Sequence, residues 1–486
     1  MQFPQFPVRG IPTLPSLSLS AAERATIDRL QRSQWRCRPE MELAEAYYLG
    51  EQVITNLRIA VPTELEFLRT IVGWGALAVD PYVERHGVDC FRLPNGTDAD
   101  QYLSDIATAN GFDAELPLAI TDALSMGHGY WMVGSPLESG GAPQITVESP
   151  LNMSVGWDLR GLEPTEALAQ YWRDGRHHAA LVLPFKTVHI AVDDNGQWVI
   201  VDRDEHGFDF VPVARMANQA RTNNRAGRSA ITPALRSTID STCRTLMGLE
   251  VAREIYSAPR MILAGASESD FQKTDGTPKS AWDTYITRVL ALERDEEGNV
   301  PELKQLTAYD PGVFTKLIDN AAARAASIVL APPQDIGLYT QGNPISADAL
   351  NTSEARRNRR ARSQQREFGV PIANVMKMAA RFDNKGVLPE KYAAIAVDWL
   401  EVEEVALVAA SDAVSKQVAA GSIPPTSDVT LKRLGYNAVE RARLERDRKR
   451  EEGRRAANAI AASLTPAQPA AEPTAIPEAP SAAAGL

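Results

Sequence analysis

Cysteine is scarce in this 486-residue chain. Its three cysteines, Cys37, Cys90 and Cys243, are far apart, and none belongs to a CxxC pair. An odd number of widely spaced cysteines predicts neither a disulfide framework nor a cysteine-ligated zinc site, and it indicates a reducing compartment.

Long apolar runs and a positive net charge are also missing. The longest uncharged apolar run is 71–79, whereas a membrane-spanning helix needs about 18 residues. The N-terminal MQFPQFPVRG has prolines where a signal peptide needs an unbroken apolar helix, so we expect a protein made in the cytoplasm with no membrane contact. The net charge of −11 excludes a protein that coats nucleic acid or an anionic membrane over its whole surface.

The sequence lacks the common motifs of catalysis. It has no P-loop, no strand-linked GxGxxG, and no HExxH, GxSxG or SxxK. The six histidines lack metal-ligand spacing, and the adjacent His177 and His178 point to opposite faces of a predicted strand. We therefore expect no enzyme, no metal and no cofactor, although an enzyme with an unrecognised site stays open as an alternative.

What is present indicates a multidomain α+β protein. Hydrophobic residues make up 44% and charged residues 23%, as in a globular chain of about three domain-sized units. Apolar spacing predicts helices over 21–33 after an N-cap at Ser20, and over 38–49, 63–74, 98–110 and 114–126. Alternation then predicts a β-meander over 130–213, with a hairpin turn at Asp194-Asn195-Gly196.

The second half of the chain is predicted to be mainly helical. Two long helices, 233–258 and 311–330, flank an insert with a strand at MILAG and a short helix at 282–292, and the second helix stops at Pro332-Pro333. Further helices are predicted over 346–368, 389–415 and 427–461. The Ala/Pro-rich tail from 465 is predicted to be disordered.

Arginines gather on the helix predicted at 346–368. Among the six between Arg356 and Arg366, Arg359, Arg362 and Arg366 fall at i, i+3 and i+7 and so share one face. That face fits either contact with phosphates or contact with another subunit. The first possibility leaves a DNA-binding protein that uses the Arg356–Arg366 helix as the alternative to the function inferred below.

Several segments, in order, resemble the phage portal proteins of the SPP1-like family. They are YYLGEQ (47–52), Asn56 followed by IVGWGALAV (71–79), GHGYW (127–131), HGFDFVPVARMANQ (206–219), GRSAI (227–231), and Ala331-Pro332-Pro333 followed by 342–369. The resemblance covers about residues 40 to 410. One departure is Glu51-Gln52, where many relatives carry a histidine two residues after the glycine.

The resemblance implies a portal fold whose chain divides into named parts. These are an N-terminal arm (1–29), a wing with a helical part and the β-meander (30–232), a stem helix (233–258), a clip (259–310), a second stem helix (311–333), a tunnel loop (334–346), a tunnel helix returning to the wing (347–410), crown helices (411–463) and a disordered tail (464–486). It also implies site residues: Tyr339, Gln341, Gly342 and Asn343 of the tunnel loop at a DNA channel, Glu293, Asp295, Glu296 and Glu297 in the clip, and Arg359, Arg362 and Arg366 as a subunit or DNA contact.

The same resemblance implies a dodecameric ring in the virion, at one capsid vertex, assembled in the host cytoplasm. Its implied partners are the terminase large subunit, the major capsid and scaffolding proteins, a head–tail adaptor, and the double-stranded DNA that passes through. The acidic charge suits a conduit, because each neutralised phosphate would add affinity and slow the sliding duplex. The missing P-loop fits as well, since the energy for packaging would come from a partner ATPase.

Overall fold

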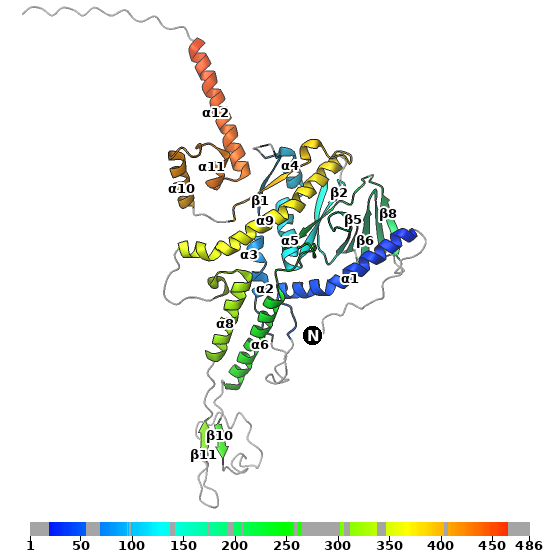
Figure 1. Ribbon diagram of the computed structural model, residues 1–486, viewed down its shortest axis with the longest axis vertical. Helices are drawn as coiled ribbons and strands as arrows, with labels where there is room; N and C mark the ends of the chain where they lie inside the picture. The colour runs from blue at the N-terminus through cyan, green and yellow to red at the C-terminus, as the bar shows by residue number, and fades with distance from the viewer. Residues whose placement is uncertain are drawn as a thin grey trace, which may run out of the picture. The chain divides into compact units, whose positions relative to one another are not determined.

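A computed structural model describes residues 19–54, 69–136 except 95, 97 and 98, 141–256 except 174, 193–197 and 207, and 261–264, 302–305, 312–337, 347–402 and 407–464. The chain divides into two compact units, 1–403 and 404–486. The first unit holds all the strands of the described chain together with helices α1 to α9, and the second is helical (Figure 1). The mixed helix and sheet content confirms the predicted α+β class.

The first helix is a single element where two were predicted. Helix α1 (Ala21–Leu49) begins in a capping box, in which Ser20 and Glu23 exchange hydrogen bonds, and it ends at Gly50 in the left-handed conformation. Both ends agree with the sequence, but the interruption between 33 and 38 is absent, and the helix starts within the predicted arm 1–29. Pro39 lies inside α1, which is buried at intervals from Ile27 to Tyr47.

Two sheets form the predicted β-meander. Strands β4 (Met153–Trp157), β5 (Pro164–Arg173), β6 (Arg176–Leu183), β7 (Lys186–Val192) and β8 (Trp198–Asp204) pair antiparallel in chain order. Strands β2 (His128–Gly134), β3 (Gln144–Glu148) and β9 (Val213–Ala217) form a second sheet in the order β3-β2-β9. Strand β4 was not predicted. The predicted turn at 194–196 lies outside the described residues, but Val192 of β7 pairs with Trp198 of β8, as a hairpin requires.

The two faces of strand β2 pack into different cores. Trp131 faces α4 (Gln101–Ala109) and α5 (Phe112–Ser125) in the main core, where its ring stacks on Phe112 at 5.2 Å. Tyr130, one residue earlier, faces Met153 and Val155 of the five-stranded sheet. A third cluster joins α1 to that sheet through Ile27 and Leu30. The three-stranded sheet thus lies between the five-stranded sheet and a helical layer.

The two long helices of the middle of the chain lie side by side (Figure 1). Helix α6 (Pro233–Tyr256) begins at the predicted proline, and α8 (Gly312–Val329) ends before Pro332-Pro333, as predicted. Between them, the predicted MILAG strand is β10 (Met261–Ala264), and it pairs antiparallel with β11 (Glu302–Gln305), which was not predicted. The helix predicted at 282–292 lies outside the described residues.

Helix α9 (Ala347–Asp383) is longer than predicted. The expected end at Phe368 is wrong, because the helix continues through Gly369 and Pro371 to Asp383 and has 37 residues in all. Phe368 and Ile372, on either side, are fully buried in the main core. Burial of this face outweighs the helix-breaking tendency of glycine and proline.

The helix predicted at 389–415 is also wrong. That stretch contains a short 3-10 turn (Glu390–Tyr392), strand β12 (Ala396–Trp399), and α10 (Leu407–Ala419) in the second unit. Strand β12 pairs with β1 (Val88–Arg92), and Arg92 forms an ion pair with Asp398 at 2.5 Å. A pairing across 300 residues leaves no local sequence signal.

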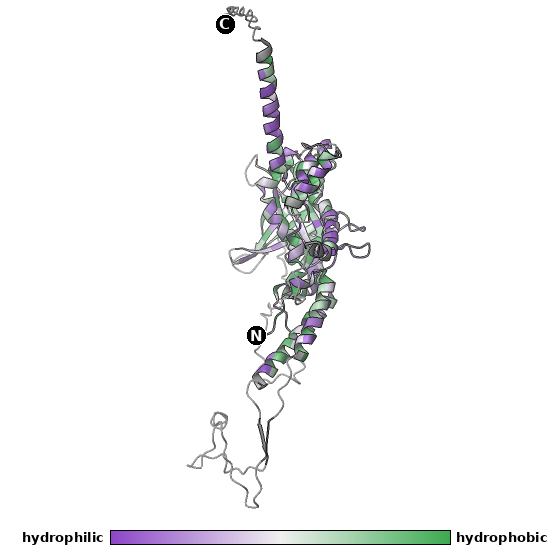
Figure 2. Cartoon of the chain, turned by 90° about the vertical axis from the view of Figure 1, so that its left-hand side faces the viewer, coloured by the Kyte–Doolittle hydropathy of each residue, from purple (hydrophilic) through white to green (hydrophobic). Residues whose placement is uncertain are grey.

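The second unit contains α10, α11 (Asp428–Arg433) and α12 (Ala438–Leu464). The single helix predicted at 427–461 is wrong, because it is interrupted at Leu434 and Gly435, the latter with a φ of 89°. Helix α12 is exposed and hydrophilic over most of its length (Figure 2), and its mixed charges form i,i+4 pairs such as Lys449–Glu445, as is usual on a solvent-exposed helix. The tail from 465 lies outside the described residues.

Glu23 should make the fold acid-sensitive. It is buried, and it pairs with Lys186 at 2.7 Å and with Arg203 at 3.2 Å. Burial alone would raise the pKa of Glu23, but hydrogen bonds from Lys186 and Ser20 lower it to about 2. Because the folded pKa lies below the unfolded value, this stabilisation is present at neutral pH and disappears as the pH falls from about 4.5 to 2.

We therefore expect Glu23→Gln to lower the free energy of unfolding by about 2 kcal/mol at pH 7. The difference from the unmodified protein should shrink as the pH approaches 2 in urea titrations. Glu42→Gln is the control, because Glu42 pairs with Arg38 on the exposed side of the same helix, and exposed pairs contribute about 0.5 kcal/mol or less. A pH-independent difference for Glu23→Gln would contradict the assignment.

Candidate functional site

The end of α8 and the first half of α9 meet at a buried ion pair. Nη1 of Arg357 lies 2.8 Å from Oδ2 of Asp335, which belongs to the 3-10 turn (Pro333–Ile336) after α8. The Arg357 side chain is 2% exposed. Nearby, the hydroxyl of Tyr82 in α3 (Asp80–Val83) donates to the carbonyl of Val329 at 3.1 Å. The two contacts hold the end of α8 and the first residues of the predicted tunnel loop.

A second set of polar contacts attaches α9 to the turn between β9 and α6. Arg360 donates to Oδ1 of Asn218 at 3.0 Å, and Gln364 donates to the same oxygen at 3.3 Å. Burial lowers the pKa of Arg360. The backbone N–H of Gln219 donates to Glu367 at 3.1 Å. The first half of α9 is thereby held against the residues that lead into α6.

Two of the portal-like motifs contact each other at this turn. Gly227 has a φ of 80°, and a Cβ there would lie 2.5 Å from the carbonyl oxygen of Gly127 and 2.6 Å from that of Asn218. Asn218 donates its backbone N–H to Gly127 and its side-chain amide to the carbonyl of Arg228. The glycine at 227 is therefore needed for close packing of the backbone between β9 and α6.

The arginine face of α9, defined as Arg359, Arg362 and Arg366, is exposed. Their predicted placement on one side of the helix is confirmed, because Arg357, Ala361 and Phe368 are buried on the other. Nη2 of Arg85 also contacts Glu354 at 3.3 Å, so an ion pair attaches this part of α9 to the turn that follows α3. Whether the face meets a subunit or DNA stays a prediction.

The other predicted site residues lie outside the described residues. These are the tunnel-loop residues Tyr339, Gln341, Gly342 and Asn343 and the clip residues Glu293, Asp295, Glu296 and Glu297. The structure describes only residues near them in the chain: Asp335, at the start of the predicted tunnel loop, with its partner Arg357, and the β10–β11 pair within the predicted clip.

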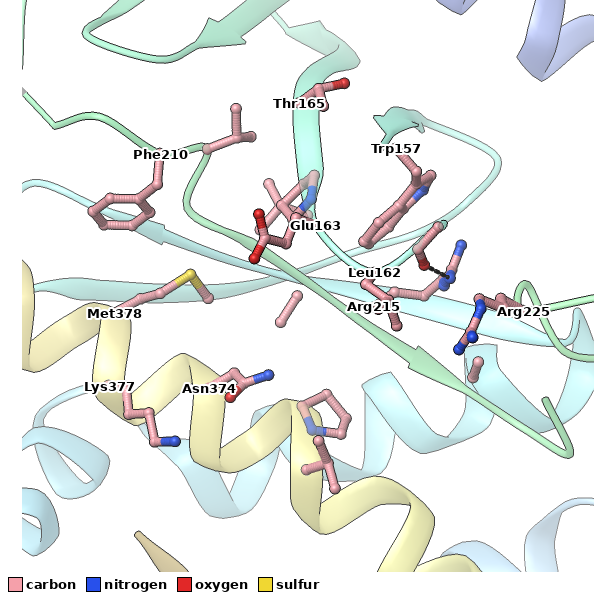
Figure 3. A pocket seen from close by; sticks show the side chains of 18 of the residues that line it. Trp157, Leu162, Glu163, Thr165, Phe210, Arg215, Arg225, Asn374, Lys377 and Met378 are labelled. Atoms are coloured by element: carbon pink, nitrogen blue, oxygen red, sulfur yellow. Dashed lines mark hydrogen bonds between the residues drawn. The ribbon is translucent and has the colours of Figure 1, made fainter. Parts of the chain in front are cut away.

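An open groove of about 1160 Å³ lies along β9, the edge strand of the three-stranded sheet. Figure 3 shows its two walls: Asn374, Lys377 and Met378 project from α9, and Trp157 and Glu163 lie opposite. The guanidinium of Arg215 lies 4.0 Å from the Trp157 ring centroid and donates to the carbonyl of Gly161. No sequence pattern predicts the groove, because its walls come from segments roughly 150 to 220 residues apart.

Perturbed titratable groups exist, but they do not form a reactive set. Burial raises the pKa of Asp122 to about 6 and lowers that of His128 to about 4. His177 and His178 contact Trp172 and Tyr171 on the two faces of the sheet, in agreement with the prediction. Within the described residues no three His, Cys, Asp or Glu side chains are placed to hold a metal ion, and none of the three cysteines forms a disulfide.

Sequence reasoning missed the most deeply buried member of the site. Arg357 belongs to the same cluster as the exposed arginines, and its type gave no reason to separate it from them. One signal was available: Arg357, Ala361, Gln364 and Phe368 recur at i, i+4, i+7 and i+11, and all four are buried.

No helix within the described ranges is both long and apolar enough to cross a membrane.

Comparison with known proteins identifies this as a phage portal protein. The chain is 30% identical over 410 residues to the portal protein of Mycobacterium phage D29, covering 82% of this chain and 83% of that protein, and 29% identical over 411 residues to the portal protein of Mycobacterium phage L5, with the same coverages. It belongs to the family described as phage portal protein, SPP1 Gp6-like, whose model matches residues 27–452. The resemblance inferred from the motifs is thereby confirmed.

Solved structures give a more distant similarity. A chain in the neck of a native GTA particle, computed with C12 symmetry, aligns with a TM-score of 0.40 and 16% identity, covering 74% of this chain and 89% of that one. A chain in the neck of an empty GTA particle, computed with C6 symmetry, aligns with a TM-score of 0.37 and 15% identity, covering 76% and 93%. The assignment therefore rests on the sequence matches. As a member of this family the chain is a structural component of the virion.

Proposed function

We propose that this portal protein forms a dodecameric ring at the unique capsid vertex and is the conduit through which double-stranded DNA is packaged and ejected. The ring would be assembled in the host cytoplasm with the major capsid and scaffolding proteins. The terminase large subunit would dock on it during packaging, and a head–tail adaptor would replace the terminase afterwards. Family membership supports the role, and the pair of helices α6 and α8 is the structural observation that carries the proposal.

Helices α6 and α8 are only partly covered within one chain. Val313 and Leu317, one turn apart on α8, are exposed at 47% and 52%. Exposure of this apolar pair to water is unfavourable, and a neighbouring subunit that covered it would stabilise the helix pair. A ring supplies that neighbour, since each subunit would place its α6–α8 pair beside the α6–α8 pair of the next subunit. We assign α6 and α8 to the stem and 259–310 to the clip.

The remaining parts follow from this assignment. The helical part and β-meander would form the wing, residues 334–346 the tunnel loop, and 411–463 the crown. The base of the tunnel loop is held by Asp335 and Arg357. The clip sequence LERDEEGN is acidic, which suits a passage that does not bind the duplex tightly.

Imaging of the purified protein tests the proposal. We expect electron microscopy to show rings with a central hole and symmetry averaging to show twelve subunits. A monomer or dimer that binds DNA with a steep salt dependence would contradict the portal role. That outcome would favour the alternative of a DNA-binding protein that uses the Arg356–Arg366 helix.

The tunnel loop should meet DNA without an ionic clamp. Residues 334–346 contain Asp335 as their sole charged residue. We expect Gln341→Lys combined with Asn343→Lys to reduce the amount of packaged DNA while leaving the ring yield unchanged, because added cations along the channel strengthen phosphate binding. The matched control is Gln341→Glu with Asn343→Glu, which should package normally. Unchanged packaging by the lysine variant would remove the loop from the DNA path.

A further inference from the structure

The exposed arginine face of α9 does not end at Arg366. Val370, Asn374, Lys377 and Arg381 continue it at intervals of three or four residues, and these four line the groove beside β9. From Arg359 to Arg381 this stripe is about 33 Å long at 1.5 Å per residue. The arginine face and the groove are thus one continuous surface, which we call the basic surface.

The groove adds positive charge and apolar contact area. Arg221 and Arg225 lie beside Arg215 on the wall opposite α9, while Glu163, Asp209 and Glu367 are its acidic residues. Asp209 is already paired with Arg381 at 3.1 Å, and Arg381 lies 4.2 Å from the Phe210 ring centroid. The basic surface therefore carries an excess of cations, although the whole chain has a net charge of −11.

Helices α4 and α5 lie in a part of the chain that has acidic residues and no basic ones. Residues 93–159 contain nine Asp and Glu residues and no Lys or Arg. Asp105 on α4 and Asp113 on α5 are exposed, and Leu118, also on α5, is 56% exposed. Their helices bury Leu103 and Leu116 in the main core, which also receives Phe368 of α9. The acidic surface, defined by Asp105, Asp113 and Leu118, and the basic surface therefore point outward from one shared core.

We propose that the basic surface of one subunit docks onto the acidic surface of the next subunit in the ring. The inference rests on the proposed function, because it needs a ring of identical chains. A ring is closed by a heterologous contact, which joins two different surfaces of the same chain. The two surfaces meet that requirement: charged residues of opposite sign predominate on them, and each has an exposed apolar residue on the same helix, Val370 on α9 or Leu118 on α5.

The character of the groove favours a protein partner over DNA. Trp157, Phe210 and Met378 line it, and such apolar walls match the buried centre of a protein interface better than a phosphate backbone. Two of its arginines are also engaged already, Arg215 with Trp157 and Arg381 with Asp209. DNA is the occupant that the test must distinguish.

Charge exchange tests the docking directly. We expect Arg359→Glu with Arg366→Glu to reduce the fraction of protein in rings about tenfold, and Asp105→Arg with Asp113→Arg to do the same, since each places like charges in contact. Combining all four changes should restore ring formation to within about twofold of the unmodified protein.

Mass photometry and electron microscopy measure the ring fraction at the same protein concentration, and fluorescence anisotropy with a labelled duplex measures DNA binding. Arg446→Glu with Arg450→Glu on the exposed helix α12 is the matched control.

The possible outcomes separate the inference from the proposed function. Rings from the unmodified protein, with no rescue by the fourfold variant, would overturn the docking and leave the portal ring intact. Full ring formation by the arginine variant with weaker duplex binding would also overturn it and assign the basic surface to DNA. Absence of rings from the unmodified protein would count against the proposed function itself. Thermal denaturation should show equal melting temperatures for all variants, because the four residues are exposed.

Discussion

Replacing Asp335 by asparagine is expected to lower the free energy of unfolding by about 3 kcal/mol. The change leaves the guanidinium of Arg357 charged, buried and without its carboxylate. Removing one partner of a buried pair is costly, because the remaining charge has neither water nor a counter-ion. The Nε and Nη2 atoms of Arg357 have no hydrogen-bond partner within the described residues, so the contact of Nη1 with Asp335 is the main compensation for its burial.

Two further variants make this prediction specific. Asp209→Asn breaks the ion pair with Arg381, where Asp209 is 68% exposed, and it should cost about 0.5 kcal/mol or less. Arg357→Met combined with Asp335→Asn should recover most of the lost stability, because an apolar side chain of similar length needs no counter-ion. Urea denaturation monitored by circular dichroism measures all three. A loss for Asp335→Asn no larger than that for Asp209→Asn would show that the ion pair is not important for the fold.

Replacing residues 265–301 by a short linker is expected to abolish DNA packaging while the wing stays folded. The segment lies between the two strands of the β10–β11 pair, in which Ala264 is opposite Glu302, so a short linker can join the two strands. Because we assign it to the clip, its removal eliminates the surface on which the terminase and the adaptor would dock. The expected result is a near-complete loss of packaged DNA. The far-UV circular dichroism spectrum of the variant should still show the helix and strand signals of a folded protein.

A separate readout distinguishes a docking defect from an assembly defect. Rings of the variant seen by electron microscopy, together with failure to retain the terminase in a pull-down, would match the assignment of the clip. Glu293→Gln with Glu296→Gln is a milder comparison that keeps the length of the segment. Normal packaging by the linker variant would overturn the assignment.

The sequence predicted most elements whose signals are local. The N-cap at Ser20, the αL end at Gly50, the start of α6 at Pro233 and the stop before Pro332 all depend on the conformational preferences of single residues. Elements decided by distant packing were missed. Pro39 and Pro371 lie inside continuous helices because both helices are buried along one side, and β12 forms because β1 is available to pair with it.

The candidate site shows the same division. Helical periodicity placed Arg359, Arg362 and Arg366 on one exposed face, which is what the structure shows. It could not show that Arg357 faces inward, since that depends on Asp335, which approaches from another element. The groove depends on three segments that meet only in the folded chain. Family membership could be predicted because the order of the motifs along the chain is visible in the sequence, whereas the contacts between distant residues are not.

Helix α9 has one point of reduced stiffness. Pro371 has no N–H, so the carbonyl of Glu367 lacks its donor in the helix, and the adjacent Gly369 has no side chain to brace the turn. On one side, Arg360 and Gln364 are attached to Asn218, and on the other, Arg381 is attached to Asp209. The missing backbone bond therefore lies between these two attachments. Because Phe368 and Ile372 are buried in the main core at the same place, side-chain packing has to keep α9 continuous where its backbone ladder is interrupted.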